Sequence, residues 1–95
     1  MRQIGWTPKS LRALKRLVKR NPDLRPAIER TLNQLAEDPF HPSLQTHKLT
    51  GDLAGIWSAS IDYKLRILFE FVGDDAESQG QSILLLNLGS HDDVY

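Results

Sequence analysis

The spacing of apolar residues changes from a helical to an alternating period midway along this 95-residue chain. Before the change, apolar side chains recur every three or four residues, at Leu11, Leu14, Leu17 and Val18, and again at Leu24, Ile28, Leu32 and Leu35. This period predicts two amphipathic helices that pack together as a helical hairpin. From His47 onward the apolar residues tend to alternate with polar ones, which is typical of strands. The chain is therefore predicted to fold as an α+β domain.

Short signals mark the ends of both predicted helices. The Thr7-Pro8 pair favours a helix start, because a hydroxyl side chain caps the first turn and proline fits the first helical position. The Asn21-Pro22 pair ends that helix, since the residue before a proline disfavours helical backbone. The second helix is expected to end near Asp38-Pro39. Residues 2–6, which precede the first helix, are predicted to form a short edge strand.

Three strands are predicted in the second half, at residues 56–61, 64–71 and 83–88. The last of these is almost wholly apolar, as expected for a central strand that is covered on both faces. Residues 73–81 are predicted to form a polar loop. The resulting order is βααβββ, a helical hairpin on a small twisted antiparallel sheet, and residues 1–95 are expected to form one domain.

The composition excludes several classes of site. The absence of cysteine rules out disulfides, thiolate catalysis and cysteine-bound zinc. The three histidines have no metal-binding spacing, so neither a metal nor a cofactor is expected. Because no apolar run is long enough to span a membrane and no signal core follows the charged start, we expect a cytoplasmic protein without membrane contact.

Charged side chains are divided unequally, although the formal net charge of the whole chain is zero. Residues 1–36 hold nine basic and two acidic residues, whereas residues 37–95 hold three basic and ten acidic residues. Part of the basic excess lies on the first predicted helix, at Arg12, Lys15, Arg16 and Lys19. Such a face suits RNA phosphates or an acidic protein partner, although long charged side chains also simply solvate a helix.

A second group of polar residues lies near the ends of the predicted strands. An imidazole gives or takes a proton near neutral pH, a guanidinium matches phosphate oxygens, and an aromatic ring stacks on a base. The candidate catalytic residues are His47, Arg66, His91 and Tyr95, and Lys48 and Lys64 are further candidates for phosphate binding. A plainer interpretation remains open for each. The histidines can be ordinary tail or turn residues, the cations can be solvated surface residues, and the Tyr95 ring can simply pack on the sheet. If the strand ends converge, the set suits chemistry on a phosphodiester.

Three segments appear in a characteristic order. They are H-K-L-T-G-D-L-A-G-I-W-S-A-S-I at 47–61, Y-K-L-R-I-L-F-E at 63–70 and I-L-L-L-N-L-G-S-H-D-D-V-Y at 83–95. Together with the βααβββ order, they resemble the RelE/ParE superfamily of toxins from bacterial type II toxin–antitoxin pairs. The resemblance covers most of the chain, and the YafQ-like members of the RelE branch are the most similar.

This resemblance implies a metal-independent endoribonuclease that cleaves mRNA in the ribosomal A site and blocks translation. In that reaction the ribose 2′-hydroxyl attacks the adjacent phosphate and leaves a 2′,3′-cyclic phosphate and a free 5′-hydroxyl. The implied partners are the ribosome with its RNA, the mRNA, and a cognate antitoxin encoded nearby whose C-terminal segment wraps the toxin.

The resemblance also implies individual roles. His47 matches the histidine before the L-T-G turn, Arg66 matches the arginine that starts the R-I-L-F strand, and His91 and Tyr95 match the terminal histidine and aromatic residue. His91 fits a general acid, and His47 fits a base or a substrate-positioning group.

Two positions depart from the YafQ-like pattern, since Ser60 replaces a second histidine and Lys64 replaces an acidic residue. These departures leave open a non-toxic member that only binds its antitoxin. A ParE-like inhibitor of DNA gyrase without nuclease activity also stays open, because ParE-like sequences often carry a histidine after the last strand too.

Overall fold

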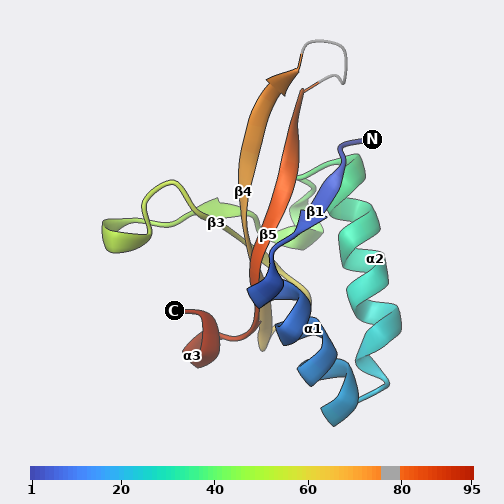
Figure 1. Cartoon of the computed structure of the whole chain (residues 1–95). Helices are drawn as coiled ribbons and strands as arrows, with labels where there is room; N and C mark the ends of the chain where they lie inside the picture. Colours follow the sequence, from blue (N-terminus) through green and yellow to red (C-terminus); the bar gives the residue numbers. More distant parts are fainter. Residues whose placement is uncertain (76–79) are drawn as a thin grey trace.

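The computed structural model describes residues 1–75 and 80–95 (Figure 1). The helices are α1 (Pro8–Arg20), α2 (Leu24–Glu37) and the single turn α3 (His91–Val94), and the 3₁₀ turns are η1 (Pro42–Leu44) and η2 (Gly51–Leu53). The strands are β1 (Ile4–Trp6), β2 (His47–Lys48), β3 (Trp57–Ser60), β4 (Leu65–Asp75) and β5 (Gly80–Ser90). The helices of this described part are not long and apolar enough to cross a membrane.

The strands form one sheet in the order β1-β5-β4-β3-β2. The predicted α+β class and the helical hairpin are confirmed. Strands β2 to β5 pair antiparallel to their neighbours, as predicted, whereas β1 pairs parallel to β5 in the register Ile4 to Ile83. The direction of β1 is not readable from local sequence, because no short turn joins it to its partner.

The ends of α1 agree with the capping signals. The Thr7 hydroxyl oxygen accepts a hydrogen bond from the Ser10 N–H, and the Ser10 hydroxyl oxygen accepts one from the Thr7 N–H. This reciprocal pair satisfies two amide groups that a helix start leaves without partners. At the other end, the Asn21 N–H donates to the Leu17 carbonyl in the final turn. Helix α2 likewise ends before Asp38, as predicted.

Helices α1 and α2 cover one face of the sheet (Figure 1), and the main core lies between these helices and the sheet. Its buried side chains are Ala13, Ile28, Leu35, Leu44, Ala59, Ile67, Phe69, Ile83, Leu85 and Leu88. Because side chains alternate along a strand, burial of Ile67 and Phe69 turns Arg66 and Leu68 to the opposite side. We call that side the open face.

The last two strands are longer than the sequence predicted. Strand β4 runs to Asp75 and β5 begins at Gly80, so both ends of the expected loop at residues 73–81 belong to strands. The middle of that predicted loop lies outside the described residues. Strands β4 and β5 extend beyond the ends of the helices (Figure 1).

The turn α3 was not predicted, and it packs against β4 and β5. A Gly89 side chain would obstruct this packing, because a Cβ atom there would lie 2.9 Å from the Asp93 Cβ and 3.4 Å from a Val94 methyl group. Val94 itself is 8% exposed. Glycine at position 89 therefore permits the turn to lie close to the sheet.

We expect Gly89→Ala to destabilise the protein by about 1–3 kcal/mol, the usual cost of an overpacked contact. Urea unfolding measures this loss. The matched control is Gly5→Ala in β1, where the new methyl group would meet a Leu84 methyl at 3.6 Å and the Ile83 carbonyl oxygen at 4.0 Å, both ordinary van der Waals contacts. A Gly89→Ala protein as stable as the Gly5→Ala protein would contradict the proposed close packing of α3.

Candidate functional site

A cavity of about 380 Å³ opens on the open face, between the β2–β3 region and α3. Its lining residues are His47, Leu49, Thr50, Leu53, Arg66, His91 and Tyr95. All four candidate catalytic residues thus line one cavity, although they come from three separate parts of the chain. We call this cavity the histidine cleft.

The pairing of β2 with β3 decides which side chains of β2 reach the histidine cleft. His47 lies opposite Ser58, and Lys48 lies opposite Trp57. Successive residues of a strand face opposite sides, so His47 faces the cleft and Lys48 does not. The Lys48 ammonium lies 5.7 Å from the centre of the Trp57 ring, in a cation–π contact.

The His47 ring is held by a backbone carbonyl. Its Nδ1 lies 3.0 Å from the carbonyl oxygen of Gln45, which has a left-handed backbone with φ of 50°. Because a carbonyl oxygen only accepts hydrogen bonds, Nδ1 must carry the hydrogen. In the neutral ring, Nε2 is then the nitrogen with a lone pair, and it can accept a proton.

Arg66 supplies the positive charge of the histidine cleft, since it is the cleft's only Lys or Arg among the described residues. Its Nη1 donates to the carbonyl oxygens of Asp62 at 2.6 Å and Leu65 at 3.1 Å. The Asp62 carboxylate is occupied in the β3–β4 turn, where it accepts the N–H groups of Lys64 and Leu65. The turn thereby anchors one nitrogen of the guanidinium, whose Nε and Nη2 donors can serve an oxygen ligand.

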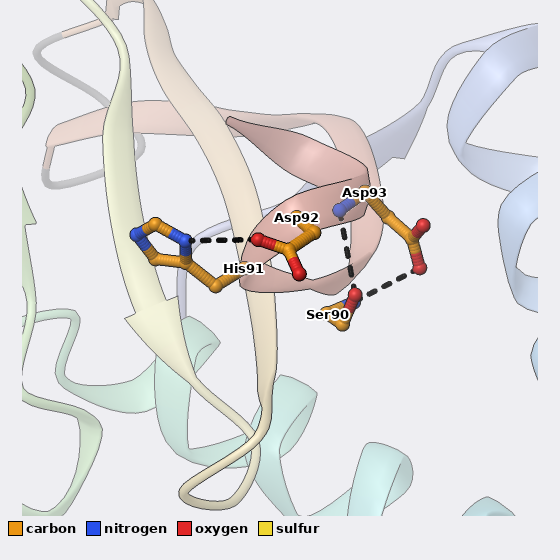
Figure 2. Close-up of polar contacts among 4 residues, drawn as sticks. All are labelled: Ser90, His91, Asp92 and Asp93. Carbon is orange, nitrogen blue, oxygen red and sulfur yellow. Dashed lines mark hydrogen bonds and ion pairs between the residues drawn. The ribbon is translucent and has the colours of Figure 1, made fainter.

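His91 and Tyr95 lie on one side of α3, because they are separated by about one helical turn. Their ring centres are 4.4 Å apart, and the Tyr95 N–H donates to the His91 carbonyl at 3.0 Å. The His91 Nδ1 lies 3.8 Å from an Asp92 carboxylate oxygen, as Figure 2 shows. The His91 side chain is 73% exposed, so a ligand in the histidine cleft can reach it.

Ser90 caps the turn that presents these two rings. Its hydroxyl accepts the Asp93 N–H at 3.3 Å, and the Asp93 carboxylate accepts the Ser90 N–H at 3.4 Å (Figure 2). A serine followed three residues later by an acidic residue is a recognisable helix start. That signal was present in the sequence and was missed.

The remaining predicted phosphate-binding residues lie outside the histidine cleft. The Lys64 ammonium lies 5.7 Å from the centre of the exposed Tyr63 ring. Lys15, Arg16 and Lys19 line a separate surface hollow on α1, and Arg12 is exposed on the same helix. The structure therefore places Arg66 in the cleft, Lys48 and Lys64 elsewhere on the strand region, and the other predicted cations on α1.

Sequence reasoning did not single out Leu49, Thr50 and Leu53, which form one wall of the histidine cleft. They belong to the segment between β2 and β3 that was predicted only as a turn. Their role in the wall depends on the β2–β3 pairing, and β2 is too short to give an alternating pattern.

Comparison with known proteins gives matches in structure only. No family model matches the sequence, and no curated protein sequence matches it. A YoeB/ParE toxin from Agrobacterium tumefaciens is 21% identical with a TM-score of 0.77, and the match covers 94% of this chain and 98% of that one. A metal-bound toxin from Helicobacter pylori is 25% identical with a TM-score of 0.76, and both chains are covered completely.

A third similar structure is the DinJ-YafQ toxin–antitoxin complex of E. coli. The match is 13% identical with a TM-score of 0.77, and it covers 100% of this chain and 99% of that one. The resemblance to RelE/ParE-type toxins is therefore confirmed for the fold over the whole chain. As for the metal-bound relative, residues 1–75 and 80–95 here contain no cluster of three or more His, Cys, Asp or Glu side chains suited to a metal ion.

Proposed function

We propose that this protein is the toxin of a type II toxin–antitoxin pair and cleaves mRNA on the ribosome. The observation that supports this proposal is the convergence of His47, Arg66, His91 and Tyr95 around one cleft. Two imidazoles and a guanidinium supply the base, the acid and the positive charge that phosphodiester cleavage requires. The toxin fold of the similar structures agrees with this function.

The reaction is an attack of a ribose 2′-hydroxyl on the adjacent phosphorus. His47 Nε2 takes the proton of that hydroxyl as the new O–P bond forms. The Arg66 guanidinium stabilises the negative charge that grows on the phosphate oxygens. His91 gives a proton to the departing 5′-oxygen as its bond to phosphorus breaks, so the products are a 2′,3′-cyclic phosphate and a 5′-hydroxyl. Tyr95 stacks on a base beside the scissile phosphate.

The deciding experiment is primer extension on a reporter mRNA in a reconstituted translation system, with and without ribosomes. We expect new 5′ ends within codons, and only in the presence of translating ribosomes. Intact mRNA together with inhibited DNA gyrase would instead support the ParE-like alternative. Intact mRNA with no growth arrest on expression would support a non-toxic, antitoxin-binding member.

The basic residues of α1 are proposed to contact ribosomal RNA through its phosphates, because they lie outside the histidine cleft. We expect Arg12→Ala/Arg16→Ala to weaken ribosome binding and to reduce the slope of log K against log salt by roughly 1 for each arginine–phosphate pair that is removed. Binding measured at several salt concentrations tests this. An unchanged slope would show that the two side chains only solvate the helix.

The antitoxin is proposed to occupy the groove between α1 and α2. This groove, of about 470 Å³, has Leu14, Val18, Ile28 and Leu32 in its lining, with Lys15, Lys19 and Arg25 among its charged residues. An amphipathic segment with acidic residues matches both the apolar lining and the positive rim. Co-purification with the product of an adjacent reading frame tests whether such a partner exists.

A further inference from the structure

Ser58 on β3 faces the same side of the sheet as Leu68 and is completely buried. It stands opposite His47 on β2 and opposite Leu68 on β4. Its hydroxyl oxygen accepts a hydrogen bond from the Tyr95 hydroxyl group. This side-chain contact joins α3 to β3 at a point directly beside His47.

Helix α3 depends on such contacts for its position. A single turn of four residues is not stable by itself, because the conformational entropy lost in ordering it exceeds the free energy gained from its first hydrogen bond. The Ser90 cap fixes the start of the turn and Val94 packs on the sheet, and the Tyr95–Ser58 hydrogen bond fixes its end. The His91 ring lies against the Tyr95 ring, with 4.4 Å between the ring centres.

We propose that Ser58 is a positioning residue, which holds Tyr95 and through it the His91 ring toward the histidine cleft. This role rests on the proposed nuclease function, and Ser58 itself does not line the cleft. Tyr95 as a residue is 41% exposed in this bonded position, so it can still contact RNA while its hydroxyl is anchored.

The substitution Ser58→Ala removes the anchor with little change in volume. Tyr95 is partly exposed, so its hydroxyl can then bond to water rather than remain buried without a partner. The fold should therefore survive. The matched control is Ser60→Ala on the same strand, whose hydroxyl donates a long 3.4 Å hydrogen bond to the Gln45 side-chain oxygen.

In single-turnover cleavage on ribosomes, we expect Ser58→Ala to lower the maximal rate constant about tenfold, the effect of one ordinary hydrogen bond. The ribosome concentration for half-maximal rate should change less than about twofold, because the cations that bind RNA are intact. Ser60→Ala should retain the wild-type values. An unchanged or higher rate constant for Ser58→Ala would overturn the positioning role.

A double-mutant cycle separates an indirect from a direct role of the Tyr95 hydroxyl. If the hydroxyl acts only through Ser58, then Ser58→Ala, Tyr95→Phe and the double variant lose the same activity. Additive losses would mean that the hydroxyl and Ser58 act independently, which overturns the proposal.

Amide hydrogen exchange tests the anchor without reference to activity. We expect Ser58→Ala to raise the exchange rates of the Asp93 and Tyr95 amides about tenfold, since both bonds belong to α3. If the wild-type protein cuts no mRNA, the nuclease function fails, yet faster exchange would still establish the anchor. Unchanged exchange in Ser58→Ala would overturn the anchor, whatever the wild-type activity.

Discussion

Replacement of Arg66 by alanine is expected to lower the rate of mRNA cleavage by about 100- to 1,000-fold, the usual cost of removing one group that stabilises transition-state charge. Among the described residues, Arg66 is the only Lys or Arg that lines the histidine cleft. The growing charge on the phosphate would then lack a nearby partner. Primer extension in a time course, together with growth arrest on expression, measures the loss.

Arg66 also stabilises the β3–β4 turn through two backbone carbonyls, so its removal affects folding as well as charge. Urea unfolding must therefore establish the folded fraction of each variant. Arg66→Lys keeps the charge but loses the planar fork, and we expect it to retain more activity than Arg66→Ala. Arg30→Ala, which removes an exposed arginine of α2, is the matched control. Full toxicity of folded Arg66→Ala would refute the assigned role.

The second large effect is expected for His91→Ala, with cleavage about 100- to 10,000-fold slower, the range for loss of a general acid or base. The fold should be unaffected, because the side chain is 73% exposed and its charged contact is with the fully exposed Asp92. Primer extension in a time course, with wild-type protein alongside, measures this loss.

His41→Ala provides a matched loss of imidazole outside the histidine cleft. The His41 Nδ1 accepts the Ser43 N–H at 3.1 Å and caps the η1 turn. We expect this variant to cleave mRNA at the wild-type rate once the folded fraction is taken into account. If His91→Ala cleaves mRNA as fast as His41→Ala does, His91 is an exposed surface residue without a catalytic role.

The elements of this fold were predictable where local chemistry decides them. The cap at Thr7, the stops before Pro22 and Pro39, and the apolar periods all act over a few residues, and each was confirmed. The direction of β1 and the extent of β4 and β5 depend on pairing across the sheet. Such pairing gives no local signal, so these features were missed or incompletely predicted.

The candidate site was likewise predictable in part. The convergence of Arg66 and His91 followed from strand alternation and the order of the elements, and the structure brings them together in one cleft. Lys48 was grouped with them because it adjoins His47 in the sequence. In the two-residue strand β2, His47 and Lys48 face opposite sides of the sheet. Only the register of β2 with β3 reveals which of the two faces the cleft.

The pairing of β1 with β5 has a consequence for how the protein is made. Synthesis produces the outermost strand of the sheet first, yet this strand finds its partner only after nearly every other segment has emerged. The rings of His91 and Tyr95 come later still. A nascent chain therefore lacks both a finished sheet and half of its proposed cutting groups. Under the proposed function, a nascent chain therefore cannot cleave mRNA until β5 and α3 have been synthesised and have folded onto the sheet.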